Sequence, residues 1–539
     1  ILDKNNNIIA DNFQVFKIAL IPREIKSIDN FLSSFSKILP ITNNEISYYK
    51  KKYRLHDKNL PFVLNKNLNW TDFSKLNYVI HNLQGAQPFM SYERTYIHPN
   101  EFAHILGYVS TPNQKDLNQI DASYLDVPNL KVGKIGLEKN SNKILLGIPG
   151  SAIYEVNAFG KRVKNIEKID GTNGSRIKTS IDKDIQIYAY QQLKEKSGSV
   201  VVMNMYGSVL CCVSSPSYDP NKFTYGISYK DYDVLKNNEK KPLVNKAMTT
   251  TYPPASTFKM IVALSALENK IITKNFRHTC KGKVDLYEQR YHCWKDKGHG
   301  RVNLKSAIKE SCDIYFYEVA RLLGIDRLQK TAFKFGLGDY VFQDFFEEAK
   351  GLVPSTSWKR EALGKSWYLG ETMISGIGQG YIKTTNVQLC KMIAQFANGG
   401  YQINASFFDS SDLALGKKII EDDEHIELIL KSLFEATNHP GGTSYRSRIA
   451  GTMKLAGKTG TAQVRKISES QREQDLKNKD LPWKFRDHSL FTGYGPADNP
   501  KYAISVVIEH GGSGSAVAAP IARNVMRKIF EKERKLNNV

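Results

Sequence analysis

A serine and a lysine in the middle of the chain, Ser256 and Lys259, are spaced as S-x-x-K and could carry out nucleophilic chemistry. Pro253 and Pro254 stop any helix before this motif, whereas the residues after it favour a helix. The spacing therefore predicts a serine at a helix N-terminus with the lysine one turn later on the same face. The lysine amine could then take the hydroxyl proton while the serine forms an acyl-enzyme. Alone, the pattern is weak evidence, because serine is common at N-caps.

Two further motifs follow in the chain. Ser311 and Asp313 flank a cysteine at the head of a helical run, and a K-T-G-T segment lies in a strand-like stretch at Lys458, Thr459, Gly460 and Thr461. The combination S-x-x-K, S-x-D/N and K-T-G is the signature of serine β-lactamases and penicillin-binding proteins. Three motifs in the right order, each in a suitable local context, favour an acyl-transfer enzyme.

The residue types of the first two motifs fit distinct steps of acyl transfer. Ser256 is predicted to be the nucleophile and Lys259 the base that takes its proton. Ser311 could relay a proton to the leaving amine. Asp313, at a position often held by Asn, could orient its neighbours or a substrate amide.

The K-T-G-T segment fits substrate binding. Lys458 supplies positive charge for a terminal carboxylate, and Thr459 adds a hydroxyl hydrogen bond. Gly460 allows an edge strand to approach the substrate closely. The backbone N–H groups of Ser256 and Thr461 could then form an oxyanion hole.

The resemblance extends beyond these motifs to nearly the whole chain. The chain is similar to the class B penicillin-binding proteins, and within that class most resembles the elongation transpeptidases, the penicillin-binding protein 2 group. The segments that carry the resemblance are VSSPSYDPN (213–221), YPPASTFK (252–259), ESCDIYFYEVA (310–320), GIGQGYIKTTNVQL (376–389), NHPGGTSYRSRIAG (438–451), AGKTGTAQV (456–464) and DHSLFTGYGP (487–496). Upstream, HILGYV (104–109) and GKIGLEKN (133–140) are similar to the non-catalytic pedestal domain of that class.

The resemblance implies a D,D-transpeptidase that cross-links peptidoglycan stem peptides during cell-wall elongation and is inhibited by β-lactams. It implies a donor stem ending in D-alanyl-D-alanine, built on a lipid-linked wall precursor, and a glycosyltransferase partner in the rod-shape complex. It also implies a single-pass protein of the bacterial inner membrane whose catalytic domain is periplasmic. No catalytic cofactor is expected.

Four potential metal ligands lie between and within the first two motifs. Cys280, Cys293, His299 and Cys312 are spaced C-x12-C-x5-H-x12-C, and Cys312 is the middle residue of the second motif. Three thiolates and an imidazole satisfy tetrahedral zinc, and four protein ligands would make the metal structural. The resemblance also implies zinc here, with Cys replacing Asp at the first two positions. A disulfide, or buried free thiols, are the alternatives.

Composition and charge limit the remaining function classes. The 539 residues carry 76 basic and 54 acidic side chains, a net charge of +22. The Lys and Arg residues are scattered and no nucleic-acid-binding signature accompanies them, so we expect no nucleic-acid partner. A surface that faces anionic lipid or acidic wall polymer is the better expectation. No apolar run reaches about 18 residues, and the chain starts at Ile1, so we expect a missing N-terminal membrane anchor.

The fold class follows from the strand and helix patterns. Apolar runs at 198–215 and from LFTGYGP to YAISVVIEH predict two hairpins, and the last residues form an amphipathic helical segment. Strand pairs at both ends with helices between indicate an α+β transpeptidase domain, an antiparallel sheet flanked by helices, over 176–539. Residues 1–175 are the expected elongated pedestal domain, with an inserted subdomain at about 41–130. A short hairpin is expected in the first 12 residues and a linker at 161–174.

Other functions remain open at this stage. A division-type class B transpeptidase and a serine β-lactamase are the enzymatic alternatives, and a scaffold that activates the glycosyltransferase is the non-catalytic one. His488 could suggest a Ser–His–Asp triad, but no G-x-S-x-G elbow surrounds Ser256, so we expect a structural role for this histidine. The glycines of GIGQG lack the rest of a phosphate loop, so a turn near the cleft is expected.

Overall fold

The computed structural model describes residues 1–58, 61–125, 127, 129–158, 162–287, 289–343, 345, 347–409, 414–465 and 478–537. The chain forms two compact units. The first comprises Ile1–Asn7, His98–Asp219 and Tyr229–Val539, and the second Ile8–Ile97 and Pro220–Ser228. Within the described ranges, no helix is both long and apolar enough to cross a bilayer. The domain boundary near residue 175 and the inserted subdomain at about 41–130 stay predictions.

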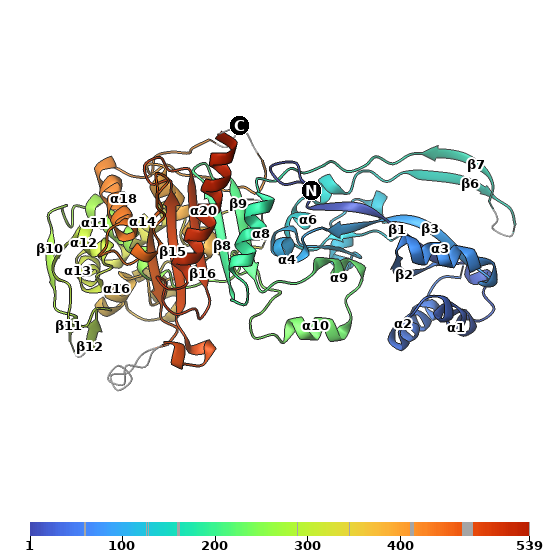
Figure 1. Ribbon diagram of the computed structural model, residues 1–539, viewed down its shortest axis with the longest axis horizontal. Helices are drawn as coiled ribbons and strands as arrows, with labels where there is room; N and C mark the ends of the chain where they lie inside the picture. The colour runs from blue at the N-terminus through green and yellow to red at the C-terminus, as the bar shows by residue number, and fades with distance from the viewer. Residues whose placement is uncertain are drawn as a thin grey trace. The chain divides into compact units, whose positions relative to one another are not determined.

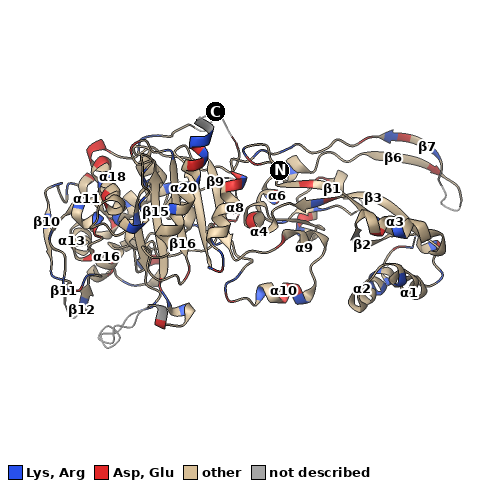
Figure 2. Cartoon of the chain, in the orientation of Figure 1, with Lys and Arg blue, Asp and Glu red and all other residues tan. Residues whose placement is uncertain are grey.

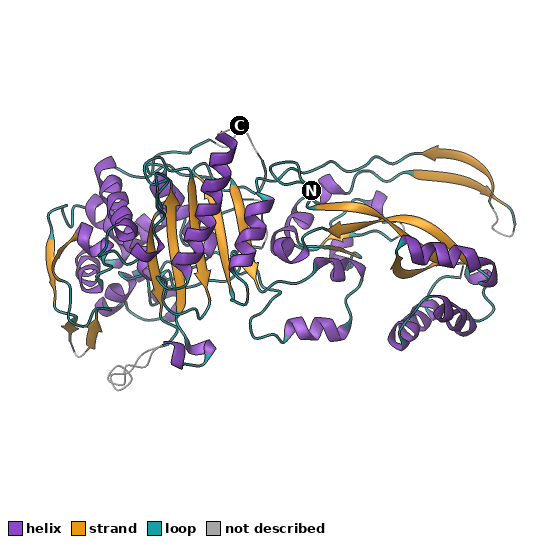
Figure 3. Ribbon diagram, viewed as in Figure 1, coloured by secondary structure: helices purple, strands orange, loops and turns teal. Residues whose placement is uncertain are grey.

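The centre of the first unit is a five-stranded antiparallel sheet (Figures 1 and 3). Its strands, in spatial order, are β14 (Ala456–Ala462), β15 (His488–Gly495), β16 (Tyr502–Ile508), β8 (Gly198–Asn204) and β9 (Val209–Ser215). Both predicted hairpins are confirmed, β8 with β9 and β15 with β16. β14 lies at the edge of the sheet, where one row of its backbone groups is open to an added strand.

Helices cover both faces of this sheet. Successive side chains of a strand point to opposite faces, and nearly all those of β8 and β9 are buried. Val200 and Val202 of β8 share a core with α8 (Lys183–Gln192) and α20 (Ala518–Asn537). Ser199 points the other way and accepts a hydrogen bond from Asn386 of α17 (Asn386–Ala397). The α+β class with a helix-flanked antiparallel sheet is therefore confirmed.

A group of helices that includes α11 (Lys259–Glu268) carries or adjoins the predicted catalytic residues of the first two motifs. Every residue from Met260 to Leu267 of α11 is buried, as expected of a helix that is apolar all round. The other helices of this region are α12 (Leu304–Lys309), α13 (Asp313–Leu323), α14 (Ile325–Lys334), α15 (Thr356–Leu363), α16 (Leu369–Ser375) and α18 (Asp423–Asn438). Two small antiparallel pairs complete it, β10 (Arg277–Cys280) with β13 (Gly300–Asn303) and β11 (Lys283–Leu286) with β12 (Gln289–His292).

The N-terminal part of the first unit corrects two expectations. The linker expected at 161–174 instead contains β7 (Arg162–Ile169), which pairs with β6 (Ser151–Val156) as an exposed hairpin. The hairpin expected in the first 12 residues is only a turn, because Leu2 pairs with Lys178 rather than across the turn. The remaining elements here are α4 (Pro99–Leu106), β4 (Val109–Ser110), α5 (Gln114–Leu117), β5 (Val132–Gly133), α6 (Gly136–Asn140), α7 (Asn142–Leu145) and α10 (Tyr229–Lys236).

The second unit is a three-stranded antiparallel sheet with its own core. The strand order is β2 (Phe62–Leu68), β1 (Ala10–Leu20) and β3 (Ala86–Tyr96). Its helices are α1 (Ile28–Ile38), α2 (Asn43–Arg54), α3 (Trp70–Val79) and α9 (Pro220–Tyr225). Asn221 of α9 exchanges hydrogen bonds with the backbone of Tyr96 at the end of β3, which ties this later segment to the unit.

Charged side chains of both signs occur together on many helices of both units, whereas the strands of the central sheet carry almost none (Figure 2). Lys and Arg therefore do not gather into one stripe, despite the net charge of +22.

Candidate active site

The predicted nucleophile lies on a strained turn. Ser256 belongs to the 3-10 turn η4 (Ala255–Phe258), which runs directly into α11. Ala255 has a φ of +49°, in the left-handed region that residues with a Cβ rarely adopt. Its N–H donates to the carbonyl of Gly378 at 2.8 Å, so the neighbouring loop helps to hold the strained turn.

The glycine-rich GIGQG segment forms a turn against the nucleophile. Gly378 has a φ of +71°, and a Cβ placed there would lie 2.2 Å from the carbonyl oxygen of Ala255. Only glycine allows so close an approach of the two backbones. The prediction of a turn in this segment is confirmed, and its role is to support the backbone that presents Ser256.

Lys259 connects the first motif with the second. Its Nζ donates to Ser311 Oγ at 3.2 Å, to the Ser311 carbonyl at 3.0 Å and to Asp313 Oδ1 at 2.7 Å. The Lys259 side chain is 0% exposed and that of Asp313 13% exposed. A buried ammonium needs such partners, because desolvation without them is costly. The arrangement gives Ser311 a direct hydrogen bond to the amine that is predicted to act as base.

The third motif lies on the edge strand beside the nucleophile turn. A Cβ on Gly460 would lie 3.2 Å from the Pro254 carbonyl oxygen and 3.3 Å from Thr257 Cγ2, so β14 passes close to η4. Thr461 Oγ1 accepts a hydrogen bond from the N–H of Gly514 at 3.2 Å. An open strand edge of this kind can bind an extended peptide through its backbone groups.

Lys458 is buried beside the other charged groups of the site. Burial, and then the charge of Lys259, lower the pKa of Lys458 well below its usual range, and Asp313 opposes the shift. Its Nζ donates to the Thr459 carbonyl at 3.0 Å. Thr459 Oγ1 in turn donates to Thr443 Oγ1 at 3.1 Å. An incoming carboxylate would stabilise the charged form of this lysine.

The four predicted metal ligands form one cluster. The three cysteine Sγ atoms and one histidine nitrogen all lie within 4.8 Å of one another. His299 Nδ1 is 3.6 Å from Cys280 Sγ and 3.5 Å from Cys293 Sγ. Ligand atoms bound tetrahedrally to zinc lie about 3.5–3.8 Å apart, since the zinc–ligand bonds measure about 2.0–2.3 Å. The donor set and its spacing therefore fit zinc.

The three sulfurs of the cluster are buried free thiols. All six cysteines lie in the described part of the chain and are free, so the disulfide alternative is not formed. A hydrogen bond from the Cys312 thiol lowers the pKa of Cys293 and raises that of Cys312, because the two sulfurs share one proton. Burial raises the pKa of Cys280. Zinc replaces such shared protons when it binds thiolates.

The cluster is joined to the second motif by a residue that sequence reasoning missed. Trp294, next to Cys293, donates its backbone N–H to Asp313 Oδ2 at 3.0 Å. Its indole Nε1 donates to the carbonyls of Glu310 and Ser311 at 3.0 and 3.1 Å. Cys312 is the N-cap of α13, directly between Ser311 and Asp313.

His488 is held by backbone contacts. Its Nδ1 accepts the N–H of His510 at 3.0 Å, and its ring packs against Tyr252 at 5.4 Å. Burial, followed by the charges of His510 and Lys383, lowers the pKa of His488 to about 3. The imidazole is therefore neutral at physiological pH, and these contacts give it a structural role.

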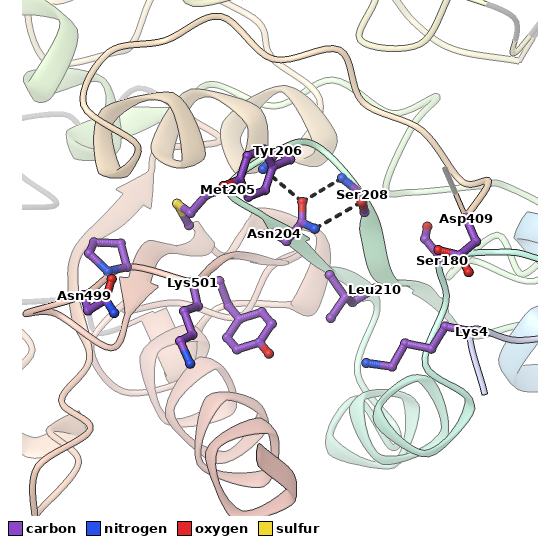
Figure 4. A pocket seen from close by; sticks show the side chains of 12 residues that line it. Lys4, Ser180, Asn204, Met205, Tyr206, Ser208, Leu210, Asp409, Asn499 and Lys501 are labelled. Atoms are coloured by element: carbon purple, nitrogen blue, oxygen red, sulfur yellow. Dashed lines mark hydrogen bonds between the residues drawn. The ribbon is translucent and has the colours of Figure 1, made fainter. Parts of the chain in front are cut away.

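A separate pocket of about 460 Å³ lies at the β8–β9 turn (Figure 4). Asn204 organises the turn, since its side chain accepts the N–H groups of Tyr206 and Ser208 and donates to Ser208 Oγ. Lys4 and Lys501 also line the pocket, but none of the predicted catalytic or metal-binding residues does. This pocket is therefore not the candidate active site.

Comparison with known proteins shows which domains and relatives the chain resembles. Residues 198–527 match the penicillin binding protein transpeptidase domain, and residues 1–179 match the penicillin-binding protein dimerisation domain. The chain is 33% identical to the peptidoglycan D,D-transpeptidase MrdA of Acinetobacter baumannii, over 97% of this chain and 79% of the relative. It is 32% identical to MrdA of Escherichia coli K12, over 98% and 85%.

Solved structures show the same similarity. Penicillin-binding protein 2 of Helicobacter pylori, in a complex with MreC, superposes with a TM-score of 0.85 at 29% identity, covering 98% of this chain and 96% of that one. Penicillin-binding protein 2 of Pseudomonas aeruginosa, in complex with WCK 5153, has a TM-score of 0.70 at 35% identity, covering 81% and 90%.

Proposed function

The chain belongs to the class B penicillin-binding proteins, and on this premise we propose which of its residues carry out the transpeptidase reaction. It is a peptidoglycan D,D-transpeptidase of the elongation type, a serine enzyme that works by acyl transfer. The observation that carries the assignment of residues is the contact of Lys259 Nζ, whose side chain is 0% exposed, with both Ser311 Oγ and Asp313.

In the acylation step, Ser256 Oγ attacks the carbonyl carbon of the penultimate D-alanine while Lys259, acting in its neutral amine form, takes the hydroxyl proton and becomes an ammonium. The N–H groups of Ser256 and Thr461 stabilise the negative charge on the carbonyl oxygen. The C–N bond to the terminal D-alanine then breaks, and Ser311 passes a proton from the Lys259 ammonium to the leaving amine. Ser256 is left esterified to the donor stem.

The edge strand orients the donor during this step. Lys458 binds the terminal carboxylate as an ammonium, and the Thr459 hydroxyl adds a hydrogen bond. In the second step, the amine of a neighbouring stem attacks the ester carbon, forms the cross-link and loses a proton that returns to Ser256. Because the acyl-enzyme waits for an amine, the site must also exclude water.

A donor-exchange assay tests this proposal. The purified chain is incubated with a pentapeptide stem ending in D-alanyl-D-alanine and an isotopically labelled D-amino acid. Mass spectrometry should detect exchange of the terminal residue with the unchanged protein and none with Ser256→Ala. Rapid turnover of a chromogenic cephalosporin without exchange would instead favour the β-lactamase alternative.

We also propose that Cys280, Cys293, His299 and Cys312 bind a structural zinc. The support is the tetrahedral spacing of three thiols and one imidazole in a buried cluster. The metal would hold together the segments that carry Cys293 and Cys312, and through the latter the second motif.

Protein purified without chelator should contain about one equivalent of zinc. Cys293→Ser should lose it, whereas Cys390→Ala, a buried cysteine outside the cluster, should retain it. Less than a tenth of an equivalent in the unchanged protein would refute the site.

We propose further that the chain acts at the bacterial inner membrane, with its catalytic domain periplasmic and an N-terminal anchor. The Helicobacter pylori relative forms a complex with MreC, which supports a rod-shape-complex partner for this chain too. The expected partners also include a glycosyltransferase of that complex, the lipid-linked wall precursor and β-lactams as inhibitors. Co-purification with MreC and the glycosyltransferase from the same source would test the protein partners.

A further inference from the structure

Trp294 has an unusual combination of exposure and hydrogen bonding. Its side chain is 59% exposed, whereas most tryptophans are largely buried. Its backbone N–H and its indole N–H nevertheless both donate to the second motif, to the Asp313 carboxylate and to the carbonyls of Glu310 and Ser311. The residue therefore contributes directed hydrogen bonds more than apolar burial.

One of the two carbonyls that the Trp294 indole contacts, that of Ser311, belongs to a strained residue. Ser311 has a φ of +58°, a left-handed conformation that costs of order 1 kcal/mol or more in a residue with a Cβ. Such a conformation persists only where the surroundings fix it. The Ser311 carbonyl accepts one hydrogen bond from Lys259 Nζ at 3.0 Å and another from Trp294 Nε1 at 3.1 Å. The indole is thus one of the groups that fix the backbone from which the Ser311 hydroxyl projects, together with Lys259 Nζ and the Ile308 carbonyl, which accepts the Ser311 N–H at 3.2 Å.

Trp294 is also attached to the cysteine–histidine cluster. It directly follows Cys293, and its ring packs against His299 with the centroids 5.4 Å apart and the planes at 67°. The cluster therefore constrains this tryptophan from its backbone and from its ring. A change in the cluster would move the indole N–H relative to Ser311.

We propose that Trp294 is a positioning residue that transmits the geometry of the Cys280–Cys293–His299–Cys312 cluster to Ser311 and Asp313. The inference rests on the acyl-transfer chemistry and on the zinc site proposed above. It predicts that the indole N–H affects how fast Ser256 is acylated, not how well a β-lactam first binds. Replacement of the exposed ring should leave the fold intact, because the ring fills no core.

The test compares Trp294→Phe with Trp70→Phe. Trp70 is 67% exposed and its ring packs against Phe16 and Phe73, which belong with it to the second unit, so it controls for the loss of an exposed indole. Stopped-flow acylation by a fluorescent penicillin separates the limiting rate constant from the dissociation constant of the first complex. We expect Trp294→Phe to lower the rate constant about tenfold, with the dissociation constant, zinc content and Tm unchanged. Trp70→Phe should match the unchanged protein in all four.

Metal removal provides the second arm. Chelation should slow acylation of the unchanged protein more than that of Trp294→Phe, because the part of its effect that passes through the indole is already lost in the variant, whereas the part that acts through Cys312 remains. Trp294 emission, taken as the difference between the unchanged protein and Trp294→Phe, should also change on chelation, since its ring lies against His299.

The outcomes separate this inference from the proposals on which it rests. No acylation of the unchanged protein would refute the proposed function itself, and an absence of zinc would refute the link to the cluster. Equal rate constants for Trp294→Phe and the unchanged protein would overturn the positioning role alone. A lower rate constant in Trp294→Phe that comes with a lower Tm and lost zinc would also overturn the positioning role. Equal effects of chelation on the acylation rates of both proteins would overturn it too.

Discussion

Lys259 and Asp313 form an ion pair that is almost withdrawn from water, with Nζ 2.7 Å from Oδ1 and the two side chains 0% and 13% exposed. The pair joins the helix that begins beside the nucleophile to the head of α13. Asp313 uses its other carboxylate oxygen to accept the backbone N–H of Trp294. The Asp313 carboxylate therefore contacts both the proposed base and the loop that follows Cys293.

Asp313→Ala should be strongly destabilising, because it removes the carboxylate paired with the buried Lys259 and leaves only the hydrogen bonds to Ser311. We expect the free energy of unfolding to fall by about 3 kcal/mol, the usual cost of breaking a buried pair from one side. Asp313→Asn keeps an acceptor and should cost less. Urea denaturation measures both. Asp285→Ala breaks an exposed pair with Arg290 and should cost less than about 1 kcal/mol. Equal losses for Asp313→Ala and Asp285→Ala would refute this account of the pair.

Gly378→Ala should impair acylation by disturbing the nucleophile turn. The new Cβ would lie 2.2 Å from the Ala255 carbonyl oxygen, so the backbone that presents Ser256 must move. Gly364 is a matched control, because its φ of +64° is similar but a Cβ there meets nothing within 4 Å. Gly364→Ala should cost only about 1 kcal/mol of strain and leave acylation unchanged. We expect at least a tenfold slower reaction of Gly378→Ala with a fluorescent penicillin. An unchanged rate would contradict the proposed support of the turn.

Glu348 should make the stability of the protein fall as the pH rises from about 4.5 to 7. Burial raises the pKa of Glu348 to about 7, against the opposing effect of the backbone N–H groups of Phe342 and Val341. Between the unfolded and folded pKa values the folded state holds more protons, so stability is lost as the proton leaves, by up to about 3 kcal/mol. Glu348→Gln should flatten the dependence in urea denaturation at pH 5 to 8. Glu361→Gln, at an exposed site, should keep it. Identical pH slopes for Glu348→Gln and the unchanged protein would count against this.

His488→Gln should acylate within about fivefold of the unchanged rate at pH 7 to 8, because His488 contacts neither Ser256 nor Lys259 among its described partners. The pKa of His488 is lowered to about 3, so its stability contribution is fully present above about 6.5 and is lost as the pH falls from there toward 3. The variant should therefore lose less stability between pH 7 and 5. A hundredfold slower acylation would revive the catalytic role that we reject.

Local patterns in the sequence predict the main elements of the fold. The β8–β9 and β15–β16 hairpins follow from apolar runs interrupted by turn residues. The segment at 162–169 reads as a linker because most of its side chains are charged or polar, and its apolar residues Val163, Ile166 and Ile169 are exposed. It is nevertheless a strand, since its backbone pairs with β6 in a hairpin that packs on no core. Hydrophobic periodicity indicates which side chains are buried, so it cannot predict a strand whose side chains are exposed.

The site residues also divide into those that the sequence predicts and those that only the structure reveals. The three motifs and the four cluster residues stand out because their chemistry depends on residue type and spacing. Trp294, Thr443 and Gly514 act through hydrogen bonds to motif residues that are distant in sequence or displaced by a loop. Nothing in their local sequence marks such contacts. The close approach of Gly378 to Ala255 is equally a property of the folded chain, although the glycine itself signals that some backbone lies near.

The most direct test of the account is intact-protein mass spectrometry after incubation with benzylpenicillin, on the unchanged chain and on Ser256→Ala. The account predicts one stable penicilloyl adduct on the unchanged protein, located to Ser256 by peptide mapping, and none on the variant. An adduct of equal yield on Ser256→Ala, or one located to another residue of the unchanged protein, would contradict the central claim that Ser256 is the nucleophile.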